Sequence, residues 1–363
     1  MAIAVHSFAK INLGLRIGPL RPDGFHQLLT IYQTVALHDR ISIEVRRGTG
    51  IEIRCEDSRV PTDDRNTCYR IADLAMQALK ASGRVVIEIQ KSLPVQGGLG
   101  GASGNAVATL IALQRALRKT LSGPEQLRIA AEIGSDLPLF LIGGTVLGVG
   151  RGEEVYPLPA FPPTPCVIAT PEISVSTPQA FADWDEMTAD REYPDCNSES
   201  GEPKPANLKE TLGQESFRDV LAKLTGPSDS YRMNEFSRRV SAWLSGLPGQ
   251  SKLGKPLSGV PARSRGRAES PLLDLVRTGI ENDFEQVVFP KYPELREVKS
   301  VFERSGAFYA SLSGSGSALY GLFKSQTAGK KAAAQLRQNG IPAVATSTLA
   351  RRLYWKKFLV SGF

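Results

Sequence analysis

Five glycines and one serine lie among the eight residues at positions 97–104. The run lies between a strand-like stretch, residues 85–89, and a helical pattern that begins near Asn105. Glycine lets the backbone adopt positive φ and approach a ligand with no Cβ in the way. The first amides of the following helix lack partners within that helix and lie at the positive end of its dipole. This arrangement predicts an anion site, and a nucleoside triphosphate is the occupant that fits it.

The predicted loop spans residues 94–106, and two other phosphate motifs are excluded. The pattern GxGxxG fails because Ser103 stands at its third glycine position. Residues 249–256 match GxxxxGK but end in Pro256, where a P-loop requires Ser or Thr for magnesium. Ser103 is expected to cap the helix or to donate to a phosphate oxygen. The expected ATP-binding residues are Pro94, Gly97, Gly98, Leu99, Gly100, Gly101, Ala102, Ser103, Gly104 and Asn105.

Two charged residues stand in apolar surroundings. Lys10 interrupts the apolar run from Phe8 to Leu13, and Asp136 lies in a tight turn beside Pro138. A buried ammonium group requires a partner. A carboxylate can accept the proton of a hydroxyl group, and a cation can stabilise the alkoxide that forms, which is the chemistry of phosphoryl transfer to an alcohol. Taken singly, each residue also has a structural interpretation that fits equally well. Asp136 could cap a turn, and Lys10 could be a charge at the edge of a strand.

The elements that would hold these residues follow from periodicity. Alternating residues predict strands, and apolar residues three and four apart predict helices. Strands are expected at 40–45, 50–54, 85–89, 167–175, 318–323 and 342–347, and helices at 66–82, 105–118, 124–133, 292–305 and 326–338. Residues 135–138 form a turn that leads into an apolar segment, 139–149. Strands come first and mixed helices and strands follow, which predicts an α+β fold.

The middle of the chain differs from its flanks. A proline-rich segment, 155–165, is expected to link two domains, 1–160 and 161–363. Residues 185–270 are polar and longer than an ordinary loop, which predicts an insertion that is partly helical and partly disordered. An acidic run, 183–202, and a basic run, 252–267, lack the interleaved aromatic residues of a nucleic-acid groove. Solvated segments are therefore expected there.

Composition narrows the class of protein. The 363 residues carry a formal net charge of +7, which fits nucleic acid or an anionic nucleotide substrate equally well. The four cysteines and three histidines have no metal-ligand spacing, so neither a zinc site nor a disulfide framework is expected. The chain has no run of 18 apolar residues and no signal-peptide pattern, so a soluble, cytoplasmic protein is expected.

Together these segments resemble the kinase superfamily of galactokinase, homoserine kinase, mevalonate kinase and phosphomevalonate kinase. That superfamily has a glycine-rich loop of this kind and a later glycine-rich block, which here is residues 311–318. Within it, the chain is most similar to the 4-diphosphocytidyl-2-C-methyl-D-erythritol kinases. Their motifs PAKINL, RPDGYH, GADVP and NDLE correspond to residues 9–13, 21–26, 134–138 and 282–285. The likeness covers residues 8–181 and 271–323.

The resemblance implies a fold and a reaction. The implied fold is α+β, a two-domain small-molecule kinase with an N-terminal half like domain 2 of ribosomal protein S5, a C-terminal ferredoxin-like half and the active site between them. ATP would be the phosphoryl donor, with Mg²⁺ expected and its ligands unassigned. The acceptor would be the 2-hydroxyl of a cytidine diphosphate sugar alcohol, in the non-mevalonate route to isoprenoid precursors. Neither nucleic acid nor membrane is an implied partner, and a monomer or weak homodimer is expected.

The resemblance also assigns roles to single residues. It implies Asp136 as the general base, and Lys10 as the group that lowers the pKa of the hydroxyl, orients Asp136, or both. Phe25 and Phe181 correspond to the aromatic residues that stack on the cytosine, and His26 corresponds to the histidine that contacts it. Base stacking on an aromatic ring contributes about 1–3 kcal/mol, so Phe25 in place of tyrosine keeps that contact.

Further substrate contacts follow from the same resemblance. Asn12 corresponds to a residue that lines the acceptor pocket, and Tyr32 to an aromatic residue near the cytidine site. The remaining implied substrate-binding residues are Thr177, Gly314, Ser315 and Gly316.

The loop departs from the family at two positions. It is GLGGASGNA here, where the family usually has GLGGGSSNA. Ala102 replaces a glycine and requires a negative φ. Gly104 replaces the second serine, which removes a hydroxyl that could contact a phosphate or magnesium.

Two other functions stay open. One is a superfamily kinase with a different acceptor, such as homoserine or mevalonate, and residues 23–26 (DGFH) argue against it. The other is a non-catalytic relative that binds nucleotide and regulates a partner through residues 185–270. The presence of both Lys10 and Asp136 argues against that role.

Overall fold

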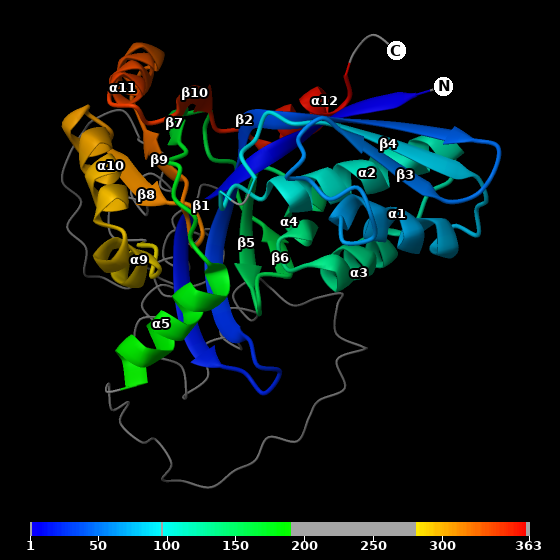
Figure 1. Cartoon of the computed structure of the whole chain (residues 1–363), viewed down its shortest axis with the longest axis horizontal. Coiled ribbons are helices and arrows are strands. Elements are labelled where there is room, and N and C mark those ends of the chain that lie inside the picture. Colours follow the sequence, from blue (N-terminus) through cyan, green and yellow to red (C-terminus); the bar gives the residue numbers. More distant parts are fainter. Residues whose placement is uncertain (1, 96, 190–280, 361–363) are drawn as a thin grey trace, which may run out of the picture.

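The computed structural model describes residues 2–95, 97–189 and 281–360, which form two sheets flanked by helices (Figure 1). The first sheet has six strands in the order β3-β4-β2-β5-β6, with β1 paired to β2. Its strands are β1 (Ile3–Leu20), β2 (His26–Arg46), β3 (Ile51–Cys55), β4 (Arg84–Gln90), β5 (Thr145–Val149) and β6 (Glu154–Pro157). All of its pairings are antiparallel except that of β3 with β4.

Five helices accompany the first sheet. They are α1 (Thr67–Ala78), α2 (Gly101–Leu117), α3 (Gly123–Ile133), α4 (Leu137–Ile142) and α12 (Arg351–Phe358). Four of them are in contact with its strands, and the fifth, α3, is packed on α1 and α4. Helix α2 is the central one, because ten of its seventeen residues are buried. Tyr354 and Phe358 of α12 belong to the same apolar core as α1 and α2, so the end of the described chain returns to the first sheet.

The second sheet has four antiparallel strands in the order β10-β7-β9-β8. These are β7 (Pro165–Ala169), β8 (Tyr309–Leu312), β9 (Leu319–Leu322) and β10 (Ala343–Ser347). The helices of this half are α5 (Thr177–Ala189), α9 (Glu285–Lys291), α10 (Pro293–Arg304) and α11 (Gln326–Gln338). Figure 1 shows α10 and α11 together on the outer side of this sheet, away from the helices of the first half. The α+β fold with two halves, which the sequence predicts, is confirmed.

A shared apolar core joins the two sheets. Ile11 of β1 and Ile31 of β2 lie in one buried cluster with Ile168 of β7 and Tyr320 of β9. The Tyr320 hydroxyl donates to the backbone oxygen of Asn12 at 2.7 Å, which ties β9 to β1 across the junction. The junction between the sheets is therefore packed and hydrogen-bonded, and it can fix groups from both halves relative to one another.

The hairpin of β1 and β2 is irregular where polar residues occur. The pairing register shifts between Phe8 and Lys10, and again between Asn12 and Gly14. A β-bulge of this kind changes the direction in which side chains leave the sheet. Lys10 and Asn12 are thus flanked by the two irregularities, in a strand that is buried over most of its length.

The structure corrects several predicted elements. Helix α2 begins at Gly101 and not near residue 105, so residues 101–104 of the predicted loop form the first turn of the helix. The segment 139–149 contains the short helix α4, which is apolar all round and therefore has no helical periodicity to detect. Helix α5 was missed because its second half was assigned to the polar insertion.

Most of the predicted insertion lies outside the described residues, as do the basic run at 252–267 and the excluded motif at 249–256. The boundary between domains near residue 160 stays a prediction. Among the helices that the structure describes, none is long and apolar enough to cross a membrane.

Candidate active site

Lys10 and Asp136 meet, although they come from different elements. The Lys10 ammonium group lies 3.4 Å from Asp136 Oδ2 and donates to Asn12 Oδ1 at 2.7 Å. Lys10 is only 3% exposed, so it is a buried cation with partners and not a charge at a strand edge. Asp136 precedes α4, but its side chain makes no capping hydrogen bond and is 34% exposed. Its carboxylate is therefore accessible to a ligand.

Tyr32 provides the second contact of this carboxylate. Its hydroxyl donates to Asp136 Oδ1 at 2.9 Å. Burial raises the pKa of Tyr32 well above its usual value, and the Asp136 carboxylate raises it further, so the hydroxyl stays protonated. Two glycines make room for the ring, since a Cβ at Gly148 or Gly152 would overlap Tyr32. The resemblance assigned Tyr32 to the cytidine site, and the observed contact with Asp136 was not expected from the sequence.

The glycine-rich loop lies directly beside Lys10. The Lys10 amide donates to the Leu99 carbonyl at 2.9 Å, and a Cβ at Gly100 would come within 3.0 Å of the Lys10 side chain. Gly100 has a φ of 69° and is the residue that precedes α2. No side chain caps this end of α2, so the capping role expected of Ser103 is wrong. The free amides of the first turn of α2 remain available to an anion.

The two substitutions in the loop fit the fold. Ala102 lies within α2, and the only non-glycine residues with positive φ in the described chain are Lys80 and Arg118. Ala102 thus meets its requirement for a negative φ. A Cβ at Gly104 would come within 2.9 Å of Ser7 Oγ and 3.1 Å of the Phe8 carbonyl. Glycine at position 104 therefore lets α2 pack closely against β1, and a side chain there would point toward that strand.

Asp39 holds both ends of the glycine-rich loop, and the sequence analysis missed it. Its fully buried carboxylate accepts from the Ser92 and Leu93 amides at 2.7 and 2.8 Å, ahead of the loop. From α2, Asn105 donates to it at 2.9 Å, and Lys91, ahead of the loop, forms an ion pair with it. The side-chain nitrogen of Asn105, a residue expected to bind ATP, is thus engaged within the protein, and its contact with ATP stays a prediction. Asp39 continues the alternation of the buried residues Ile41 and Ile43, and an acidic residue at such an inward-facing position was the signal that could have identified it.

The later glycine block closes the same site. Ser313 Oγ donates to the Gly98 carbonyl at 3.0 Å, and a Cβ at Gly98 would overlap the Ser313 carbonyl. A Cβ at Gly314 would lie 3.5 Å from the Lys10 ammonium nitrogen, so this backbone also reaches Lys10. Asn282 holds the block by donating to the carbonyls of Leu312 and Gly314 at 2.9 and 2.7 Å.

The expected substrate residues at the edge of this block also interact. Thr177 at the start of α5 and Ser315 share a hydrogen bond of 2.7 Å between their hydroxyls. Gly316 adopts a φ of 97°, which favours glycine. The start of α5 is thus tied to the later glycine block.

A second cluster of predicted residues lies around His26. The His26 ring stacks on Phe181 with a centroid distance of 5.1 Å and an interplanar angle of 3°. Its Nδ1 lies 3.0 Å from the Gly18 carbonyl, and because a carbonyl only accepts, Nδ1 must carry the proton. Its Nε2 lies 3.1 Å from Asp185, a residue of the acidic run that was expected to be solvated. Because Nδ1 is engaged by the backbone, recognition of a ligand by His26 would use Nε2 and would require Asp185 to move.

Phe25 stands apart from this pair. It is 51% exposed, and the Arg151 guanidinium lies 4.9 Å from its ring centroid. Within the described chain no ring contact joins Phe25 to Phe181. The stacked pair that the structure contains is His26 with Phe181, and the pair expected to enclose a base was Phe25 with Phe181.

A metal site made by the protein alone is not evident in the described residues, where no three His, Cys, Asp or Glu side chains gather. Mg²⁺ in phosphotransferases is held by one or two carboxylates together with the phosphates of the substrate. The single accessible carboxylate of Asp136 is compatible with such a shared arrangement.

Comparison with known proteins agrees with this geometry. Residues 66–144 match the family model of the GHMP kinases N terminal domain, and residues 268–342 match the GHMP kinases C terminal model. A 4-diphosphocytidyl-2-C-methyl-D-erythritol kinase of Solibacter usitatus is 32% identical over 89% of this chain and 82% of that protein.

Solved structures show the same relationship. The crystal structure of a 4-(cytidine 5'-diphospho)-2C-methyl-D-erythritol kinase superposes with a TM-score of 0.63 at 26% identity, covering 95% of this chain and 99% of that one. The homoserine kinase of Cytophaga hutchinsonii superposes with a TM-score of 0.61 at 19% identity, covering 96% and 95%. The second likeness shows the fold alone, so shape does not distinguish the acceptor.

Proposed function

Because this chain belongs to the family of 4-diphosphocytidyl-2-C-methyl-D-erythritol kinases, we propose that it transfers the γ-phosphoryl group of ATP to the 2-hydroxyl of 4-diphosphocytidyl-2-C-methyl-D-erythritol. The chain is an ATP-dependent small-molecule kinase of isoprenoid precursor biosynthesis. The observation that carries the proposed chemistry is the contact of Lys10 with Asp136 beside the glycine-rich loop.

Asp136 is the general base of the proposed reaction. Its carboxylate takes the proton of the acceptor hydroxyl, the hydroxyl oxygen forms a bond to the γ-phosphorus, and the bond to the leaving ADP oxygen breaks. Two fixed donors support this role, since the Tyr32 hydroxyl and the Lys10 ammonium hold the two carboxylate oxygens in place. Lys10 also lies where it can stabilise negative charge on the acceptor oxygen.

The phosphates of ATP bind to the loop of residues 97–104 and to the first turn of α2. The free amides at the start of this helix and the close approach of the backbone at Gly98 and Gly100 support this assignment. Asp39 holds the loop in place by accepting hydrogen bonds from Ser92 and Asn105 on its two sides. Mg²⁺ would be held mainly by the ATP phosphates, with Asp136 as the carboxylate nearest to them, and would neutralise part of their charge.

The cytosine of the acceptor is recognised by His26 and the rings near it. With the proton of Nδ1 directed to the Gly18 carbonyl, His26 can offer Nε2 as an acceptor to the exocyclic amino group of cytosine once Asp185 has moved away. The face of Phe181 now packed against His26, and the exposed ring of Phe25, supply stacking surfaces. Asp185 Oδ1 lies 3.1 Å from Nε2, so binding of cytosine at this nitrogen requires the Asp185 side chain to move.

An ADP-release assay with purified protein tests the proposal. We expect turnover with ATP, Mg²⁺ and 4-diphosphocytidyl-2-C-methyl-D-erythritol, and little turnover with homoserine or mevalonate. Turnover no greater than that of Asp136→Asn would exclude catalysis by this site. Turnover with homoserine or mevalonate alone would keep the kinase and exclude the proposed acceptor.

A further inference from the structure

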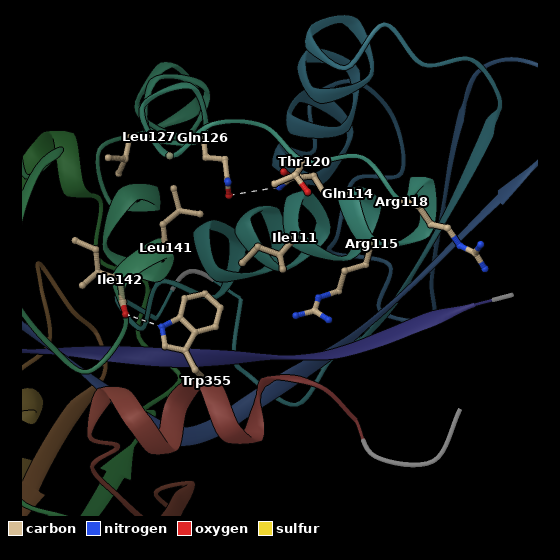
Figure 2. Close-up of a pocket in the computed structure, with 11 residues that line it drawn as sticks. Ile111, Gln114, Arg115, Arg118, Thr120, Gln126, Leu127, Leu141, Ile142 and Trp355 are labelled. Carbon is tan, nitrogen blue, oxygen red and sulfur yellow. Dashed lines mark hydrogen bonds between the residues drawn. The ribbon is translucent and has the colours of Figure 1, made fainter.

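A hollow of about 640 Å³ lies near the C-terminal end of α2, whereas the glycine-rich loop lies at its N-terminal end (Figure 2). Its volume is in the range of sites for small molecules. Its wall includes Ile111, Arg115 and Arg118 of the α2 region, Leu141 and Ile142 of α4, and Trp355 of α12. None of these residues belongs to the active site described above.

One side of the hollow is apolar. Ile111, Leu141 and Ile142 form it together with the indole of Trp355. The indole N–H donates to the Ile142 carbonyl at 3.0 Å, so its polar atom is satisfied and the ring is held in one orientation. Figure 2 shows the indole standing between α12 and α4 with this hydrogen bond drawn. The ring remains 38% exposed, which leaves an ordered aromatic surface without a cover among the described residues.

The other side carries two positive charges. Arg115 and Arg118 both line the hollow, and in the described part of the chain neither forms an ion pair. The nearby Arg128 of α3 is different, because it pairs with Glu125 and Glu132. Arg118 follows the last residue of α2 with a left-handed backbone, so its side chain leaves in a different direction from that of Arg115, as Figure 2 shows. Both guanidinium groups nevertheless border the same hollow, and guanidinium forks match the geometry of phosphate oxygens.

We propose that this hollow is an accessory binding site for an amphipathic organic phosphate. The apolar part of the ligand would lie against Trp355 and Ile111, and its phosphate would lie on Arg115 and Arg118. The two arginine charges favour an anionic ligand over a neutral lipid-like molecule. The ordered indole of Trp355 favours a ligand with an apolar part over a simple inorganic ion. The site does not depend on the reaction proposed for the chain, so it can be tested without turnover.

Isothermal titration with octyl phosphate tests the site, with octanol and inorganic phosphate as partial probes. We expect saturable one-to-one binding of octyl phosphate and much weaker binding of either partial probe. Arg115→Gln and Arg118→Gln should each weaken binding about tenfold, the effect of losing a hydrogen bond to a charged group. Arg128→Gln removes the same charge from a neighbouring helix outside the hollow and should leave the affinity unchanged.

Two results would overturn the site. If Arg115→Gln and Arg118→Gln bind octyl phosphate as tightly as Arg128→Gln does, the contact is nonspecific. If saturating ATP abolishes binding, the probe occupies the nucleotide site. Tryptophan fluorescence gives an independent check, because octyl phosphate should alter the emission of the wild type and not that of Trp355→Phe. These variants should keep the kinase turnover of the wild type, which shows that they are folded.

Discussion

The region around Lys10 and the region around His26 are built differently. Lys10 lies where β1, the glycine-rich loop, the turn before α4 and the later glycine block converge, and backbone contacts fix that junction. His26 lies next to the turn between β1 and β2, against α5 and close to an exposed Phe25. In the reaction proposed above, the chemical step would use a preorganised, buried setting, whereas recognition of the acceptor would use a periphery that can rearrange.

The largest expected effect is at the carboxylate of the buried region. Asp136→Asn should lower kcat about 10²–10⁴-fold, because the neutral amide cannot take a proton. ADP release measures kcat, and titration of ATP should show unchanged nucleotide affinity. A loss of less than tenfold would mean that another group accepts the proton and that the Lys10 region does not hold the base.

Lys10→Met tests the cation of the same region. It should lower kcat about 10²–10³-fold, because the charge on the acceptor oxygen loses its stabilising partner. Lys291→Met is the matched control, since Lys291 pairs with Asp183 on the surface of the other half and should leave kcat unchanged. Equal losses in both variants would point to a general effect of charge or stability.

His26→Ala tests the peripheral region, where the comparison predicts an effect on binding and not on chemistry. The KM for the cytidyl acceptor should rise about tenfold to a hundredfold, because a stacking and hydrogen-bonding contact of about 1–3 kcal/mol is lost. The KM for ATP and the kcat should change little in the same assay. A fall in kcat with an unchanged acceptor KM would contradict the assignment of His26 to recognition of the cytosine.

Tyr32→Phe decides to which region Tyr32 belongs. The contact with Asp136 predicts a fall in kcat of about tenfold, the effect of losing a hydrogen bond to a charged group, with the acceptor KM unchanged. The resemblance alone placed Tyr32 near the cytidine, and it predicts a higher acceptor KM with an unchanged kcat. Steady-state kinetics with both substrates varied distinguishes the two outcomes.

Phe25→Ala should have the smallest effect. The ring is exposed and its only ring contact in the described structure is with Arg151, an interaction of about 0.5–1 kcal/mol. We expect the acceptor KM to rise about twofold to fivefold. A rise as large as that of His26→Ala would show that Phe25 closes onto the base in the complex, and that the periphery rearranges more than the unliganded structure suggests.

The sequence predicted much of the fold because most of its elements are regular. The helix at 326–338 and the strands at 40–45 and 85–89 have the periodicity of buried faces, and the structure contains them as α11 and as parts of β2 and β4. Helices α4 and α12 were missed for the opposite reason. Helix α4 is uniformly apolar and α12 is rich in charge, so neither shows the alternation that marks an amphipathic helix.

By itself, the sequence determined the family, the glycine-rich loop and the identity of the charged pair, because these depend on residue types at short spacing. The tertiary structure decided which groups meet. Tyr32 reaches Asp136 across 104 positions, and Gly98 reaches Ser313 across 215. Asp39 gained its role only when β2 brought it beneath the loop. Such contacts depend on the packing of whole elements, and no local pattern in a single sequence records that packing.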